Sequence, residues 1–298
     1  MDLGRLVTAL ITPFAEDGQV DEPGIDVLVN HCIDTGTTGI VACGTTGESP
    51  TLSHEEKLRV FARTLQATDG RIPVLAGTSS NDTRASIELS KEAEAMGVNG
   101  LLLVAPYYNK PTQDGLYAHF SAIANAVSIP VMLYNIPGRC GVNIEPSTIL
   151  RLANSVPNIV AVKEASGDIT QIGRIAADKP DDFLLYSGDD KMTLPVLALG
   201  GTGVVSVASH VVGQEMQAMI TAFMDGRIQE AADWNGRLLP VFEGLFQVSN
   251  PAPLKAALKL LNLPAGDVRL PLISAPNQVL RSLSIELERL GKLEQAHV

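Results

Sequence analysis

Eight short apolar segments dominate the first 207 residues, and they alternate with helical patterns at intervals of ~20–33 residues. Short apolar runs between turn residues predict strands that are buried on both faces of a parallel sheet. Such a sheet closes on itself at eight strands, so we expect an α/β fold, a (β/α)8 TIM barrel. An open doubly wound sheet is the alternative, but it carries a glycine-rich turn after its first strand, where this chain has Thr12-Pro13-Phe14. The expected strands are residues 6–12, 39–43, 72–76, 100–105, 130–135, 159–164, 183–187 and 203–207.

The apolar strands stop after Ser209, and further helical patterns follow at 212–225, 228–247, 253–261 and 275–290. The first of these helices can close the barrel. We therefore predict a barrel over residues 1–225 and a C-terminal helical extension over residues 226–298. The composition at the start of the extension is not that of a linker, so we expect the extension to pack on the barrel.

Charge and cysteine usage exclude several classes of function. The formal net charge is -11, the pI is near 4.9 and no basic run occurs, so nucleic acids and anionic membranes are not expected partners. The three cysteines are widely spaced, without a CxxC pair, which fits a reducing cytoplasm. No apolar stretch approaches the ~18 residues that span a bilayer. The sequence contains no histidine pair of the HExxH kind, so the histidines do not indicate a metal site.

The sixth predicted strand ends in a lysine, Lys163. A lysine is rarely fully buried without a partner or a chemical purpose. Desolvation favours the neutral amine, which is a nucleophile toward carbonyl groups. The stretch alone leaves two structural interpretations open, because the side chain could reach out to water or pair with a carboxylate such as Glu164.

Strand parity predicts which side chains of this segment face the barrel interior. Alternate residues share that side, namely Ile159, Ala161 and Lys163. Val160 and Val162 are expected to face the helices. Glu164 then points away from the lysine, which makes it a poor candidate for a salt bridge with Lys163.

Polar residues follow several other predicted strands, at the end of a barrel where its chemistry lies. The turn Gly44-Thr45-Thr46-Gly47 can be a cradle for an anion or simply a tight turn. Tyr134 lies at the end of the fifth strand, where a phenol can transfer a proton, and Arg139 can bind a carboxylate. Tyr107 and Tyr108 follow the fourth strand, and paired loop tyrosines are more often packing or interface residues than catalysts.

An acidic pair, Asp189 and Asp190, follows the seventh strand. It could bind Mg²⁺, but a lone acidic pair on a loop is usually solvated or caps a helix. The strand-end lysine, the phenol, the hydroxyl groups and the arginine together suggest Schiff-base chemistry on a 2-oxo acid. The iminium would withdraw electrons from the adjacent methyl group, which would lose a proton and become an enamine nucleophile.

Five motifs occur in order along the chain: GTTGES at 44–49, PYYNKP at 106–111, YNIPGR at 134–139, KEASGD at 163–168 and YSGDD at 186–190. By these motifs the chain resembles the pyruvate-dependent class I aldolase family, which includes dihydrodipicolinate synthase and N-acetylneuraminate lyase. The resemblance runs from about Leu6 to about Pro271. It implies a lyase that needs no metal or organic cofactor and forms a homotetramer, a dimer of tight dimers.

The resemblance also implies roles for individual residues. Lys163 would form the Schiff base with pyruvate, and Tyr134 would be the central acid and base. Thr45 and Tyr108 would complete a proton relay with Tyr134, with Tyr108 reaching in from a neighbouring subunit. The remaining positions would bind substrate or line the lysine: Thr45 and Thr46 at the pyruvate carboxylate, Arg139 at the carboxylate of the second substrate, and the backbones of Gly188 and Val205 beside Lys163.

Arg139 guides the choice of the second substrate. The lyases for N-acetylneuraminate or 2-keto-3-deoxy sugar acids share the lysine and the tyrosine but generally lack this arginine, and they are the alternative. The resemblance therefore implies condensation of pyruvate with L-aspartate 4-semialdehyde, giving 4-hydroxy-tetrahydrodipicolinate in cytoplasmic lysine and diaminopimelate biosynthesis. Two other classes are less supported: a metal-dependent barrel lacks a ligand set, and a non-catalytic small-acid-binding barrel would not need the whole relay.

Some synthases of this kind are inhibited by lysine in a pocket at a dimer interface. Sensitive members carry a histidine where this chain has Lys57 and a glutamate where it has Ala85. Lys57 would repel the ammonium group of the ligand, and Ala85 removes a carboxylate that would pair with it, so we expect weak or absent feedback. The matching positions are Ser49, Pro50, His54, Lys57, Asn81, Ala85 and Tyr107.

Overall fold

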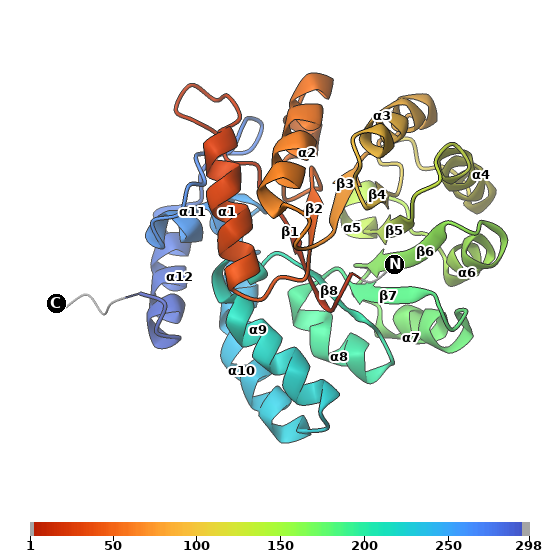
Figure 1. Cartoon of the computed structure of the whole chain (residues 1–298). Helices are drawn as coiled ribbons and strands as arrows, with labels where there is room; N and C mark the ends of the chain where they lie inside the picture. Colours follow the sequence, from red (N-terminus) through yellow and green to blue (C-terminus); the bar gives the residue numbers. More distant parts are fainter. Residues whose placement is uncertain (1–2, 294–298) are drawn as a thin grey trace.

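The computed structural model describes residues 3–293 and confirms the predicted barrel. Eight strands pair in parallel in the order in which they occur, and the last strand pairs with the first. Figure 1 shows the helices arranged around this central ring of strands. The strands are β1 (Leu6–Ala9), β2 (Gly39–Ala42), β3 (Val74–Gly77), β4 (Gly100–Val104), β5 (Val131–Asn135), β6 (Ile159–Glu164), β7 (Leu184–Ser187) and β8 (Gly203–Ser206).

The helices follow the strands in the expected alternation, and short polar side chains fix several of their starts. Ser53 and Glu56 form the capping box at the start of α2, and Asp168 accepts hydrogen bonds from the first turn of α7. The helices are α1 (Glu22–Asp34), α2 (His54–Thr68), α3 (Thr83–Ala95), α4 (Gln113–Ala124), α5 (Pro137–Cys140), α6 (Pro146–Ser155), α7 (Ile169–Asp178), α8 (Thr193–Ala198), α9 (Ser209–Met224), α10 (Ile228–Gly244), α11 (Ala252–Leu260) and α12 (Asn277–Arg289).

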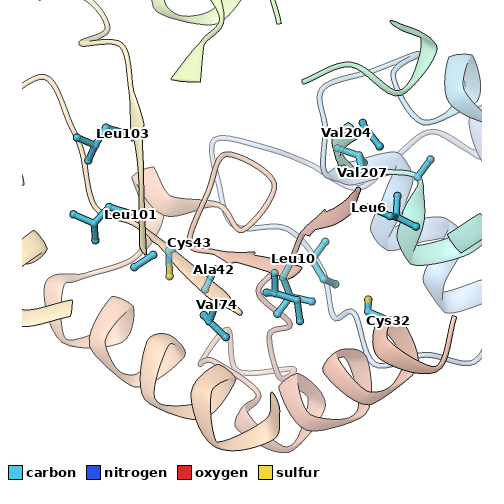
Figure 2. Close-up of a cluster of buried hydrophobic side chains, with 14 of the residues drawn as sticks. Leu6, Leu10, Cys32, Ala42, Cys43, Val74, Leu101, Leu103, Val204 and Val207 are labelled. Atoms are coloured by element: carbon cyan, nitrogen blue, oxygen red, sulfur yellow. The ribbon is translucent and has the colours of Figure 1, made fainter. Parts of the chain in front are cut away.

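Two separate hydrophobic clusters hold the barrel together. The larger one fills the layer between the strands and the helices, and Figure 2 shows part of it, including Leu10 of the loop after β1 with Val74 and Leu101. The smaller one fills the inside of the barrel. Its buried members come from strands around the ring: Val7, Ala9, Val41, Leu75, Leu102, Met132, Tyr134, Ala161, Tyr186 and Val205, with Leu3 at the start of the chain.

The lower half of β6 corrects the predicted parity. Ile159 belongs to the outer cluster and Val160 packs against the inner one, so the predicted sides of these two residues are wrong. The cause is a register shift against β5, where Val131 pairs with Ile159 but Met132 already pairs with Ala161. A bulge inserts one unpaired residue and reverses the alternation below it. Above the bulge, Ala161 and Lys163 keep the predicted side.

The C-terminal helices pack on the barrel. Figure 1 shows α10 beside α9, and α11 and α12 next to each other near α1. Residues 225–227 form the turn between α9 and α10, and the division of the chain at residue 226 stays a prediction. Residues 294–298 of the predicted extension lie outside the described residues. Within the described part of the chain, no helix is both long and apolar enough to cross a membrane.

Candidate active site

Lys163 lies near the carboxyl end of β6 and is 4% exposed. Its Nζ atom lies 4.2 Å from the centre of the Tyr134 ring on the neighbouring strand, and the two residues are paired in the β5–β6 register. Gly188 makes room for the lysine, because a Cβ at this position would lie 3.1 Å from both Cγ and Cε of Lys163. The barrel therefore holds the amine against a phenol ring at its carboxyl-terminal end.

The environment of Lys163 favours its neutral form. The pKa of the amine is lowered to about 8, mainly by burial, while the charge of Asp190 raises the pKa and the charge of Arg139 lowers it. Among the described residues, no carboxylate forms an ion pair with Lys163. A substantial fraction of the amine is thus neutral near pH 8, whereas an ordinary lysine is almost fully protonated there.

Glu164 faces away from the lysine, as predicted. Its carboxylate accepts hydrogen bonds from the Asn135 side chain at 3.0 and 3.3 Å and from the backbone N–H of Ser166 at 2.7 Å. The structure thereby removes the interpretation in which Glu164 pairs with Lys163.

Tyr134 is buried in the inner cluster, and burial raises the pKa of its phenol to about 12. The charge of Arg139 and a side-chain hydrogen bond with Thr45 act in the opposite direction. Tyr134 therefore holds its proton at neutral pH and lies in contact with both the amine and the threonine. This arrangement suits a group that gives and recovers a proton.

A cavity of about 350 Å³ opens next to Tyr134. Thr45, Tyr134 and Arg139 line it together, and Arg139 reaches it from α5 directly after β5. Among the described residues that line it, Lys57 and Arg139 are the charged side chains, and both are basic, so the cavity suits an anionic ligand.

The loop after β2 is a tight turn that is closed by its own backbone hydrogen bonds. Backbone N–H groups of Glu48 and Ser49 bond back to the carbonyls of Thr45 and Gly44, at 3.0 and 3.3 Å. Gly47 is required here, because a Cβ would lie 3.0 Å from the Leu10 carbonyl oxygen. Thr45 lines the cavity, whereas Thr46 is buried beside it and its hydroxyl accepts a hydrogen bond from another part of the chain.

That other part is the C-terminal extension, and these contacts are absent from the sequence predictions. The Asn250 side-chain amide donates to Thr46 Oγ1 at 2.9 Å. The Lys255 amine lies 2.7 Å from Glu48 Oε1, and the Arg269 backbone N–H donates to Glu48 Oε2 at 2.9 Å. Glu48 and Arg269 are separated by 221 positions, so no local pattern links them.

The two loop tyrosines have different surroundings. Tyr107 is half-buried and lines the cavity. Tyr108 is 89% exposed, with a φ of 73°, and does not line the cavity of its own chain. A non-glycine residue with positive φ is uncommon and indicates a locally constrained turn. The structure thus brings Lys163, Tyr134 and Thr45 together and leaves Tyr108 pointing to solvent.

The acidic pair after β7 divides into two roles. Asp189 accepts from the backbone N–H of Lys191 at 3.0 Å and caps a short 3-10 helix, Asp190–Met192. Asp190 is buried, so of the two expected roles, solvated or capping, the solvated one is wrong for this residue. Its Oδ2 accepts from the N–H groups of Val207 and Ala208 at 3.1 and 3.0 Å, and burial raises its pKa to about 6. It joins the loops after β7 and β8 and influences Lys163 through its charge.

The remaining predicted positions lie inside the barrel, on the cavity wall or outside the cavity. Val205 of β8 belongs to the inner cluster with Tyr134. Ser49, Pro50, Lys57 and Tyr107 share the wall of the cavity. The others lie outside it: His54 is hydrogen-bonded to Glu92 at 2.8 Å, the Asn81 carbonyl accepts from Asn109, and Ala85 is in the first turn of α3.

Comparisons with known proteins place this geometry in a family context. The profile of the Dihydrodipicolinate synthetase family matches residues 2–290. A protein of Moorella thermoacetica named 4-hydroxy-tetrahydrodipicolinate synthase is 52% identical over 293 residues, which is 98% of this chain and 100% of that protein.

Solved structures agree in fold over nearly the whole chain. The crystal structure of dihydrodipicolinate synthase from Bacillus anthracis has a TM-score of 0.95 at 48% identity and covers 97% of this chain and 98% of its own. The chloride-inhibited dihydrodipicolinate synthase of Acinetobacter baumannii, complexed with pyruvate, has a TM-score of 0.94 at 39% identity, covering 98% of this chain and 100% of its own.

Proposed function

This chain belongs to the dihydrodipicolinate synthetase family, and on that premise we propose that it condenses pyruvate with L-aspartate 4-semialdehyde. The product would be 4-hydroxy-tetrahydrodipicolinate, an intermediate of lysine and diaminopimelate biosynthesis. The observation that carries the proposal is the buried Lys163 amine, with its lowered pKa, 4.2 Å above the ring of Tyr134.

In the proposed reaction, the neutral Lys163 amine attacks C2 of pyruvate and forms a carbinolamine. Tyr134 donates the proton with which the hydroxyl group leaves as water, and an iminium remains. Loss of a proton from C3 gives the enamine, which attacks the aldehyde carbon of the semialdehyde. The amino group of the second substrate then attacks C2, so that the ring closes and the lysine amine is released.

The loop after β2 and Arg139 support the binding of two carboxylates. Thr45 and Thr46 are assigned to the pyruvate carboxylate, and Gly188 and Val205 to the walls around Lys163. Arg139 is assigned to the carboxylate of the semialdehyde, because it lines the cavity and is not engaged in an ion pair with any described residue. Its planar guanidinium can bind a carboxylate through two parallel hydrogen bonds.

Borohydride reduction in the presence of pyruvate tests the chemistry. The expected result is a mass increase, corresponding to reduced pyruvate, on the peptide that contains Lys163. The peptide that contains Lys255 serves as an internal control, because this second buried amine lies outside the candidate site. Modification of any other lysine, or of none, contradicts the proposed mechanism.

Turnover assays test the second substrate. Aspartate semialdehyde should react, and N-acetylneuraminate and 2-keto-3-deoxy sugar acids, the substrates of the alternative lyases, should not. Arg139→Ala should weaken semialdehyde handling by roughly 10- to 150-fold, the range of a charged hydrogen bond, while pyruvate trapping changes far less. An equal loss in both steps would make Arg139 structural.

We further propose a homotetramer in which Tyr108 completes the relay in a neighbouring subunit. Its exposure and its absence from its own cavity support this assignment. Mixing the inactive variants Tyr108→Phe and Lys163→Ala tests it, because a mixed dimer would regain one complete site. No gain of activity after subunit exchange contradicts a shared relay, and analytical ultracentrifugation gives the oligomeric state.

For regulation, we propose weak or absent inhibition by lysine. Lys57 lies on the cavity wall, where its ammonium group opposes that of a lysine ligand, and Ala85 offers no carboxylate. Activity halved by sub-millimolar lysine contradicts this proposal.

We assign the reaction to the cytoplasm, which the three free, buried cysteines support.

A further inference from the structure

The loop that carries Thr45 and Thr46 is held by a residue of the C-terminal extension. Asn250 lies between α10 and α11, is 4% exposed, and is separated from Thr46 by 204 positions. Its Nδ2 atom donates to Thr46 Oγ1 at 2.9 Å, and both side chains are buried. Among the described residues, this is the only hydrogen bond of the Thr46 hydroxyl.

This hydrogen bond determines where the Thr46 proton can go. A side-chain NH₂ group can only donate, and a hydroxyl group has a single proton. While Thr46 Oγ1 accepts from Asn250, its own proton must point elsewhere. The hydroxyl is then free to donate to a carboxylate bound beside Thr45. The reversed amide would instead take up the Thr46 proton and remove one donor from the loop.

A second contact between the extension and the same loop keeps this arrangement in place. Glu48, two residues after Thr46, is paired with Lys255 at 2.7 Å and accepts from the Arg269 backbone N–H at 2.9 Å. Asn250 precedes α11, and α11 carries Lys255. The extension therefore contacts the loop on both sides of Gly47, at Thr46 and at Glu48.

We propose that Asn250 is a positioning residue, which turns the Thr46 hydroxyl into a donor for the carboxylate of the 2-oxo acid. The inference rests on the proposed function, because it assumes that this loop binds the pyruvate carboxylate. It extends the site to a segment outside the barrel.

The test measures the pyruvate concentration that half-saturates borohydride trapping at Lys163. Asn250→Asp keeps the shape of the side chain but offers only acceptors near neutral pH, so it should capture the Thr46 proton and repel the substrate carboxylate. We expect the half-saturating concentration to rise roughly 10-fold or more in this variant. Asn250→Ala merely releases the hydroxyl, and a rise of roughly 3- to 10-fold is expected.

A double-mutant cycle separates positioning from a structural role. In a Thr46→Val background the hydroxyl is gone, so Asn250→Ala should change the half-saturating concentration by less than about twofold. Asn235→Asp is the matched control, because Asn235 also has a buried, unpaired Oδ1 in the extension but no hydrogen bond to the loop among the described residues. This control should leave pyruvate saturation unchanged.

The outcomes distinguish this inference from the proposed function. If the wild type traps no pyruvate at Lys163, both are overturned. If the wild type traps pyruvate but Asn250→Ala saturates like it, only the inference is overturned. The same holds if Asn250→Ala has equal effects with and without the Thr46 hydroxyl, because the amide would then support the fold alone.

Discussion

Two buried lysines in this molecule have similar burial and a similar aromatic neighbour but differ in their polar partners. Lys163 at the end of β6 is 4% exposed, and Lys255 in α11 is 2% exposed. Each amine lies 4.2 Å from the centre of an aromatic ring, Tyr134 for Lys163 and Phe14 for Lys255. Burial lowers the pKa of each to about 8. Only Lys255 has a carboxylate in contact, Glu48 at 2.7 Å.

The difference shows what turns a buried lysine into a nucleophile. Lys255 also donates to the Asp267 carbonyl at 2.9 Å, so its ammonium group is held by one hydrogen bond and one ion pair, and the ion pair joins the extension to the loop after β2. Lys163 has no such partner among the described residues, and the ring below it carries a hydroxyl group. Burial alone is therefore shared by a structural and a candidate catalytic lysine, and the absence of a carboxylate distinguishes the second.

The largest expected effect comes from removing the amines one at a time. Lys163→Met should abolish both pyruvate trapping and turnover, because no covalent intermediate can form. Lys255→Met should retain trapping at Lys163 in the fraction of protein that is folded. Peptide mass analysis after borohydride treatment, with circular dichroism to report folding, measures both. Trapping that survives in Lys163→Met would end the distinction between the two lysines.

Replacing Tyr134 by phenylalanine makes the ring beneath Lys163 equivalent to the ring beneath Lys255. We expect turnover to fall by roughly 10²–10⁴-fold, the usual contribution of a positioned acid and base. The fold should change little, because only one hydroxyl group is lost. Steady-state kinetics measures the loss, and a decrease of less than about tenfold would mean that another group moves the proton.

The ion pair of Lys255 should contribute to the stability of the fold rather than to activity. Lys255→Met leaves the buried Glu48 carboxylate uncompensated, and we expect a loss of about 3–5 kcal/mol in the free energy of unfolding. The double variant Lys255→Met with Glu48→Gln should lose less than the single variant, because no charge remains unpaired. Denaturant titration compares the two, and equal losses would mean that the pair contributes packing only.

Lys163→Met should act in the opposite direction on stability. Removing an unpaired buried ammonium group should raise the free energy of unfolding by about 1–3 kcal/mol near pH 7. The pKa of Lys163 is lower in the folded protein than its ordinary 10.5, so the cost of burial is full below pH 8 and disappears as the pH rises toward 10.5. The difference in the free energy of unfolding between wild type and variant should therefore decrease from pH 8 to pH 10.5, as measured by denaturant titrations.

The smallest effect concerns Asp190, whose charge raises the pKa of Lys163. Asp190→Asn can still accept from the N–H groups of Val207 and Ala208 but carries no charge. The midpoint of the pH dependence of trapping should move below the wild-type midpoint, by less than about one pH unit, because the charge that raises the pKa of Lys163 is gone. A midpoint that moves upward would show that Asp190 acts through loop structure and not through its charge.

The barrel could be predicted because each strand has a local sequence pattern. Short apolar runs between turn residues need no knowledge of the rest of the chain, and their number implies closure. The orientation of the side chains at the end of β6 could also be predicted, because strand alternation holds for Ala161 and Lys163. Parity failed for Ile159 and Val160, where a bulge depends on the register with β5 and leaves no mark in the apolar run.

The candidate site could be predicted only in part, for a related reason. Lys163, Tyr134 and Thr45 lie at strand ends, so the fold class alone brings them together. Asn250 and Lys255 contact the loop after β2 through the packing of the extension, and their partners lie about 200 positions away in the sequence. The burial of Asp190 likewise follows from contacts with the turn between β8 and α9, which the residues of its own loop do not reveal.

The contacts between the extension and the loop after β2 also have a consequence for the order in which the parts of the site form during synthesis. The ribosome synthesises a chain from its amino terminus, so Asn250 is added 204 residues after Thr46. At typical rates of synthesis this interval lasts ~10–40 s. During that time the nascent barrel can already contain Lys163 and Tyr134, but the loop waits for its final partner. The contacts of this loop with the extension are therefore completed only after residue 250 has been added, and under the proposed function the pyruvate carboxylate would bind to a loop whose final contacts form late in synthesis.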